Sequence, residues 1–129
     1  MTTMTDPTST VTGGVDTHKD TLVAAALDGL GRLLGTKEFP TTAAGYRHLL
    51  HWLRSFGELT TVGVEGTGAW GAGLARFLTS AEVEVVEVQR PNRQHRRRHG
   101  KSDPVDAISA ARTVLAGEAT FAQSQGWTP

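Results

Sequence analysis

The sequence predicts a single α/β domain built on a mixed β-sheet. Three strand-like segments come before the first helix-like segment, and strands and helices alternate after it. Consecutive strands favour antiparallel hairpins, whereas alternating strands and helices favour parallel crossovers. A chain of 129 residues suffices for one ordinary domain, which buries roughly two-thirds of its unfolded surface. We therefore expect antiparallel strands on one side of the sheet and parallel strands on the other.

Composition excludes several classes of protein. No run of residues approaches the ~20 apolar positions of a membrane-spanning helix. The chain has 0 Cys, which excludes disulfide scaffolds, thiolate zinc sites and cysteine nucleophiles. Residues 1–10 are rich in Thr and lack a signal-peptide pattern. We expect them to form a disordered leader, and we expect a cytoplasmic protein with no membrane partner.

The first part of the chain predicts the three consecutive strands. Residues 11–16 and 21–27 have a strand-like pattern, and the break at 18–20 predicts a tight hairpin between them. The Asp-Gly pair at 28–29 is a strong turn signal, and a third strand is expected at 32–39. These segments form the antiparallel side of the expected sheet.

A helix is expected between Pro40 and Gly57. Its apolar residues are spaced by 3, 4, 7 and 10 positions, which places them on one face of a helix. That face consists of Tyr46, Leu49, Leu50, Leu53 and Phe56. The helix is therefore expected to cover one side of the sheet.

The second part of the chain alternates strands and helices. A strand at 59–65 is followed by a glycine-rich bend at 66–71 and a second helix ending near Ala81. This helix is expected to bury Trp70, Leu74, Phe77 and Leu78. A strand at 83–88 and a helix at 104–116 complete the order β-β-β-α-β-α-β-α. Ribonuclease-H-like domains are built in this order.

Four carboxylates fall where such a fold places catalytic groups. Asp16 and Glu65 end the first and fourth strands, and parallel strand ends meet at one crevice. Asp103 and Asp106 are three residues apart at the start of the last helix, hence on one face. Clustered carboxylates repel one another unless a cation lies between them, and hard oxygen ligands suit Mg²⁺ or Mn²⁺. Each acid also has a structural explanation, such as capping for Asp103, so only the set is specific.

Three motifs resemble those of a known family. GVDTHK at 14–19, GVEGTG at 63–68 and KSDPVDA at 101–107 are similar to the three motifs of the DEDD transposases of the insertion-sequence 110 family. They occur in the family's order and on the fitting elements. The resemblance covers roughly residues 11–117.

The resemblance implies a RuvC-like fold, with Asp16, Glu65, Asp103 and Asp106 as a tetrad that binds Mg²⁺ or Mn²⁺. It also implies DNA as substrate, a structured bridge RNA as guide and assembly into homo-oligomers. Members carry a second, C-terminal domain with a nucleophilic serine. We expect 11–117 to be the catalytic domain and 118–129 a tail, and the sequence to be a truncated copy or isolated domain without that second domain.

The positive charge of the chain is concentrated in one window. The net charge is +0, yet residues 90–101 contain 6 of the 13 basic residues and no acid, so the remainder is net −6. The basic side chains are Arg90, Arg93, Arg96, Arg97, Arg98 and Lys101. Because the window has no aromatic residue, phosphate contact with RNA or DNA is a more natural use than base reading. A solvated charged loop is the alternative.

Other interpretations remain open. The glycines at 66–71 fit G-x-G-x-x-G, and Glu87 fits a ribose-binding acid, so a dinucleotide-binding domain is a minor alternative. A non-catalytic remnant that binds RNA, DNA or transposase subunits is a stronger one. His18 and Lys19 are expected to be exposed turn residues, and Trp52 and Trp70 core or interface residues rather than base platforms.

Overall fold

A computed structural model describes residues 9–88 and 104–117 of the chain. The described elements are β1 (Thr10–Thr17), β2 (Thr21–Asp28), β3 (Leu33–Pro40), α1 (Ala43–Arg54), β4 (Glu58–Glu65), η2 (Thr67–Gly71), α2 (Ala72–Ser80), β5 (Glu84–Val88) and α4 (Pro104–Leu115). The expected order is confirmed, with the short η2 turn added before α2. The proposed tail and the basic window lie outside the described residues, and so does the proposed leader except for Ser9 and Thr10. Thr10 already belongs to β1, so the ordered chain begins before the expected end of the leader.

The five strands form one mixed sheet in the order β3-β2-β1-β4-β5. β1 pairs with β2, and β2 with β3, in antiparallel fashion, whereas β1–β4 and β4–β5 are parallel pairs. This is the predicted division between an antiparallel and a parallel side, in a ribonuclease-H-like arrangement. β1 lies at the centre, so both kinds of pairing meet on the strand that carries Asp16.

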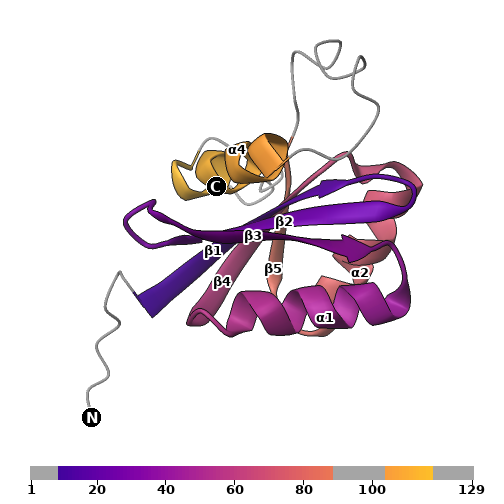
Figure 1. Ribbon diagram of the computed structural model, residues 1–129, viewed down its shortest axis with the longest axis horizontal. Coiled ribbons are helices and arrows are strands. Elements are labelled where there is room, and N and C mark those ends of the chain that lie inside the picture. Colours follow the sequence, from indigo (N-terminus) through magenta and orange to yellow (C-terminus); the bar gives the residue numbers. More distant parts are fainter. Residues whose placement is uncertain (1–8, 89–103, 118–129) are drawn as a thin grey trace, which may run out of the picture.

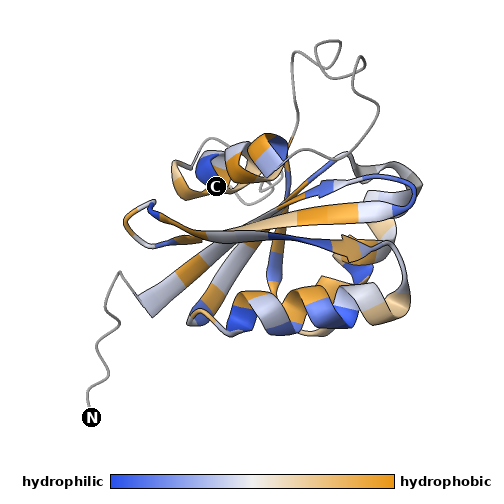
Figure 2. Cartoon of the chain, viewed as in Figure 1, coloured by the Kyte–Doolittle hydropathy of each residue, from blue (hydrophilic) through white to orange (hydrophobic). Residues whose placement is uncertain are grey.

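Helices cover both faces of the sheet. In Figure 1, α1 and α2 lie on one face and α4 on the other. The main core lies between the sheet and α1 and α2, where Val15, Val62 and Val64 of the strands belong to one buried cluster with Leu49 and Leu53 of α1. Along α1, apolar residues recur at helical spacing, with polar residues between them (Figure 2). Its N-cap is Thr42, whose hydroxyl accepts a hydrogen bond from the Gly45 amide at 3.0 Å.

Glycines allow α4 to pack closely on the other face. A Cβ atom at Gly14 in β1 would meet the Ala107 carbonyl and the Ala111 amide of α4. A Cβ at Gly63 in β4 would lie 2.5 Å from Val114. Side chains alternate between the two faces of a strand. Asp16 in β1 and Glu65 in β4, each two residues after one of these glycines, therefore lie on the same face as Gly14 and Gly63.

The turn after β2 is organised by a buried carboxylate. Asp28 Oδ1 accepts hydrogen bonds from the amides of Leu30 (2.9 Å) and Arg32 (3.0 Å), and Oδ2 accepts one from Arg32 Nε at 2.9 Å. The backbone hydrogen bond from Arg32 is the largest influence that lowers the pKa of Asp28, and burial opposes it. The Asp-Gly turn signal thus corresponds to a tight turn held by the side chain of its first residue.

One expected element differs from the structure. Trp70 was expected on the buried face of the second helix, but α2 begins only at Ala72, and Trp70 is 44% exposed. The preceding η2 turn is interrupted at Gly68, whose backbone angles (φ 3°, ψ −148°) are not helical. The helical period therefore starts only after this interruption, which leaves Trp70 outside it. Of the expected set, Leu74 and Leu78 are fully buried. No described helix is long and apolar enough to cross a membrane.

Candidate active site

Two of the predicted site residues are direct neighbours across the sheet. Asp16 and Glu65 are Cα partners in the parallel pairing of β1 with β4. Val15 and Val64 point into the core under α1 and α2. Because side chains alternate, Asp16 and Glu65 lie on the opposite face, with Gly14 and Gly63 beneath α4. The expectation that the two strand ends bring these acids together is therefore borne out in the backbone register.

The third acid comes from the helix that covers this face. Asp106 lies in the first turn of α4, and α4 packs against β1, β2 and β4. Asp106 is 6% exposed, Asp16 2% and Glu65 3%. Three buried carboxylates thus come from two strands of the sheet and from the helix that covers one face of it. Asp103, the fourth member of the predicted tetrad, lies outside the described residues.

Burial of these acids is unusual for a small domain. Asp and Glu are almost never fully buried unless they are paired or coordinate a metal, because an isolated charge is costly to remove from water. Glu65 has interactions of its own, and its buried Oε1 oxygen accepts no hydrogen bond from the described residues. Buried ionisable groups that carry such an energetic cost cluster at functional sites, which makes this edge of the sheet the candidate site.

His18 is a partner of Asp16. Its Nε2 atom lies 3.0 Å from Asp16 Oδ2, and its side chain is 32% exposed. The hairpin holds the residue in place, since its amide donates to the Thr21 carbonyl at 3.0 Å and its carbonyl accepts from Thr41 Oγ1 at 2.9 Å. The sequence favoured an exposed turn residue here. The structure instead gives a half-buried side chain that contacts a predicted site residue.

Thr17 ties the ends of β1 and β4 together. Its hydroxyl lies 3.0 Å from the Glu65 carbonyl oxygen and also contacts the Gly66 carbonyl oxygen. Gly66 has φ +79°, and a Cβ there would lie 3.1 Å from Thr17 Oγ1. Sequence reasoning gave Thr17 no role. In the sequence, only its position directly after Asp16 pointed to Thr17. The contact itself could not be seen there, because it joins residues 48 positions apart.

The metal expectation is only partly supported by geometry. Within residues 9–88 and 104–117, no group of three or more His, Asp or Glu side chains lies close enough together to hold a metal ion. The chemistry of the donors does fit a hard divalent cation, because buried carboxylate oxygens are the ligands that Mg²⁺ and Mn²⁺ prefer. Asp16, Glu65 and Asp106 are therefore candidates whose ligand set is not complete among the described residues.

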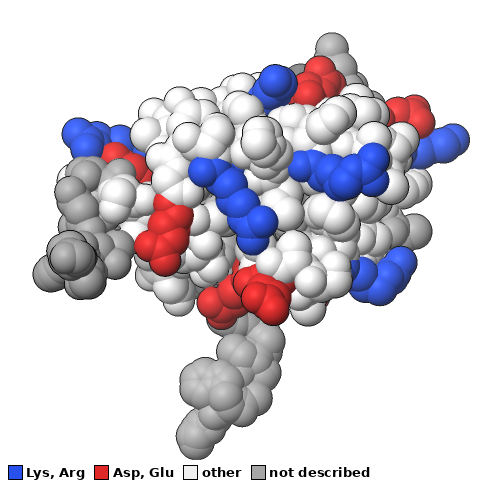
Figure 3. All heavy atoms as spheres, turned by 90° about the horizontal axis from the view of Figure 1, so that it is seen from below, with Lys and Arg blue, Asp and Glu red and all other residues white. Residues whose placement is uncertain are grey.

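The basic window is connected to this edge at both ends. Val88, the last described residue before it, is the β-sheet partner of Glu65. Pro104, the first described residue after it, is the start of the helix that carries Asp106. The predicted basic residues from Arg90 to Lys101 themselves lie outside the described part of the chain. On the face that carries α1, Lys and Arg side chains are interspersed with acidic ones (Figure 3).

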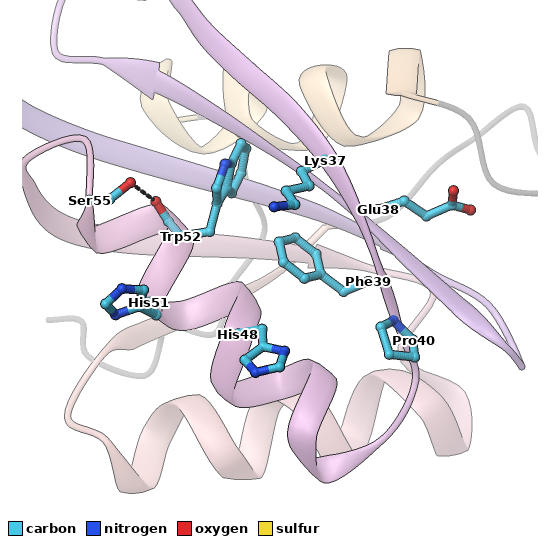
Figure 4. A pocket seen from close by; sticks show the side chains of 8 residues that line it. All are labelled: Lys37, Glu38, Phe39, Pro40, His48, His51, Trp52 and Ser55. Carbon is cyan, nitrogen blue, oxygen red and sulfur yellow. Dashed lines mark hydrogen bonds between the residues drawn. The ribbon is translucent and has the colours of Figure 1, made fainter.

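The described pockets lie away from the carboxylates. One of about 430 Å³ lies between β3 and α1, where Lys37, Phe39 and Trp52 point toward one another (Figure 4). Its remaining lining residues are Glu38, Pro40, His48, His51 and Ser55. Another, of about 420 Å³, lies on the outer side of α4. Neither pocket is lined by Asp16, Glu65 or Asp106.

Comparison with known proteins agrees with the motifs. A family model described as a transposase, of the DEDD type named after insertion sequence 110, matches residues 13–126. A search of curated proteins found no match. The matched range contains all three motifs and every described element after the start of β1. The chain therefore belongs to the DEDD transposases of the insertion-sequence 110 family, proteins of DNA transposition and recombination.

Proposed function

We propose that this chain carries the strand-cutting site of its transposase. In this proposal Asp16, Glu65, Asp103 and Asp106 hold divalent metal ions at the edge of the sheet, and the reaction is cleavage of a DNA phosphodiester. The observation that carries it is the register pairing of Asp16 with Glu65, both buried on the face that α4 and Asp106 cover. A structural role alone gives little reason to bury three acids on one face.

The proposed metal supplies a familiar kind of chemistry. Divalent ions between carboxylates activate the attacking oxygen and stabilise the leaving oxygen of a phosphodiester. Carboxylates suit this task better than amides because they neutralise the charge of the ion. Mg²⁺ is the proposed ion, with Mn²⁺ as a substitute.

The residues around the carboxylates have supporting roles in this proposal. His18 orients Asp16 through the contact between Nε2 and Oδ2. Thr17 holds the end of β4 next to the end of β1, so that Asp16 and Glu65 stay adjacent. Beyond Glu65, a Cβ at Gly68 would meet nothing within 4 Å among residues 9–88 and 104–117. This open backbone leaves room for a phosphate group to approach the acids.

The nucleic acid is proposed to bind through the basic window. Arg90, Arg93, Arg96, Arg97, Arg98 and Lys101 would contact phosphates. The described residues that flank the window are Val88, the sheet partner of Glu65, and Pro104, which begins the helix of Asp106. Binding of this kind is strongly salt-dependent. The resemblance to the family adds a structured bridge RNA, beside DNA, as the second nucleic acid, and homo-oligomers as the working form.

A metal-dependent cleavage assay tests the proposal. We expect the chain to cut labelled DNA in the presence of Mn²⁺ or Mg²⁺, and Asp16→Asn to abolish cleavage while nucleic-acid binding remains. Asp20→Asn is a matched control, because Asp20 is an exposed acid in the adjoining hairpin turn. Equal cleavage by the Asp16→Asn and wild-type chains would exclude the carboxylate site. Binding without any cleavage, by wild type as well, would favour the alternative that the chain is a binding module.

A further inference from the structure

Trp70 is an exposed aromatic residue close to the carboxylate edge. It is 44% exposed, whereas Trp52 and Tyr46 are partly buried against the core. Among the described residues, the ring contacts are Phe39–Trp52, Tyr46–Phe77 and Trp52–Phe56, and Trp70 takes part in none of them. An indole left half in water without a ring partner contributes little to folding, which points to a role in binding.

The backbone around Trp70 places it near Glu65. Trp70 lies five positions after Glu65, and the η2 turn that carries it packs against β1 and β4. The intervening glycines keep this approach open. Gly66 has φ +79°, which favours glycine, and a Cβ at Gly68 would meet no atom of the described residues within 4 Å. No described side chain therefore crowds Gly68, which lies between Glu65 and Trp70 in the sequence.

The chemistry of an indole selects one feature of a nucleic acid. Every base has a π-face, so stacking on Trp tolerates any sequence but requires a base that is not stacked inside a duplex. The basic window lacks aromatic residues, and in the proposed function it contacts phosphates. A second kind of contact is needed to distinguish an unpaired strand from a duplex, and Trp70 has the exposure and location to provide it.

We propose that Trp70 stacks on an unpaired base of the nucleic acid beside the cleavage site. The inference rests on the proposed function, because it takes the carboxylate edge to be where the strand is bound. Trp70 then selects single-stranded or locally opened nucleic acid, while the basic residues supply most of the salt-dependent affinity.

The test measures binding of a fluorescein-labelled oligothymidylate to the 129-residue chain in EDTA, by polarisation, with the matching duplex as a second probe. Trp70→Ala should weaken single-strand binding ~10-fold or more, the usual loss on removing a base-stacking ring. Trp70→Phe should retain most of the affinity, and Trp70→Leu, which keeps apolar area without a π-face, should resemble Trp70→Ala. The slope of log affinity against log salt should be the same for all variants, because no phosphate contact is removed.

Several results would overturn the inference. These are affinities of the wild type and Trp70→Ala within about twofold, a Leu variant that binds as well as the Phe variant, or no binding by the wild type. A change in oligomeric state of Trp70→Ala in sedimentation, with unchanged oligonucleotide affinity, would assign the indole to a protein interface instead. Because the binding assay contains no metal, a negative result for Trp70 says nothing about the carboxylates, which the Asp16→Asn cleavage assay tests. A negative result in the cleavage assay likewise leaves the binding assay of Trp70 to be judged on its own.

Discussion

At the scale of single residues, the candidate site depends on contacts made by neighbours of the acids. His18 contacts Asp16 on the hairpin side, and Thr17 connects the end of β1 with the Glu65 carbonyl. Both contacts restrict the position of a strand end rather than bury apolar area. Small losses there should therefore change the geometry of the site more than the stability of the core.

The hydroxyl of Thr17 gives a direct prediction. Thr17→Val keeps the shape but leaves the buried Glu65 carbonyl without this donor, which should lower the free energy of unfolding by ~1–3 kcal/mol. Thr17→Ser retains the hydroxyl and should be the more stable of the two variants. Urea unfolding of the three proteins measures the difference. Equal stability of the Val and Ser variants would show that the hydroxyl holds nothing in place.

Asp28 predicts a pH dependence of stability. Its pKa in the folded chain lies below the ordinary value of 3.8, chiefly because of the Arg32 backbone hydrogen bond. Its contribution is therefore fully present above the unfolded pKa and is lost as pH falls through the folded pKa. Asp28→Asn should destabilise the chain near neutral pH, and the difference from wild type should shrink below pH 3.8. A difference that stays constant across that range in urea unfolding would contradict the assignment.

At the scale of elements, the contact between α4 and the sheet decides whether Asp106 can act with Asp16 and Glu65. α4 lies close to β1 because Gly14 offers no side chain to the Ala107 carbonyl and the Ala111 amide. The packing of backbone on backbone leaves no flexible atom that could move aside. The position of the third acid therefore depends on a glycine in another element.

Gly14→Ala should push α4 away from the sheet. We expect a loss of ~1–3 kcal/mol in the free energy of unfolding, as for other overpacked sites, together with weaker Mn²⁺ binding. Gly35→Ala is the matched control, since its Cβ would lie 3.4 Å from Phe56, in ordinary contact. Thermal unfolding of both variants provides the comparison. If Gly14→Ala were as stable as Gly35→Ala, close packing of α4 would not be required.

At the scale of the whole molecule, the sequence predicts the architecture better than the details of the site. The order of elements, the antiparallel and parallel sides of the sheet, and the adjacency of Asp16 and Glu65 follow from patterns within each segment and the rule that parallel strand ends meet. The His18 and Thr17 contacts could not be predicted, because they depend on the register between distant segments. The exposure of Trp70 could not be predicted either. The expected helix was extended back across Gly68, where the backbone is not helical.

The central proposal concerns the molecule as a unit: carboxylates from β1, β4 and α4 are proposed to hold metal ions together. Calorimetric titration of Mn²⁺ into the wild-type chain, Asp16→Asn and the Asp20→Asn control tests it most directly, since the measurement requires no nucleic acid. We expect the wild type and Asp20→Asn to bind with similar affinity, and Asp16→Asn to bind at least ~10-fold more weakly, because removing a carboxylate ligand costs more than removing an outer-shell partner. Folded protein that binds no Mn²⁺, or Asp16→Asn that binds as well as Asp20→Asn, would contradict the claim.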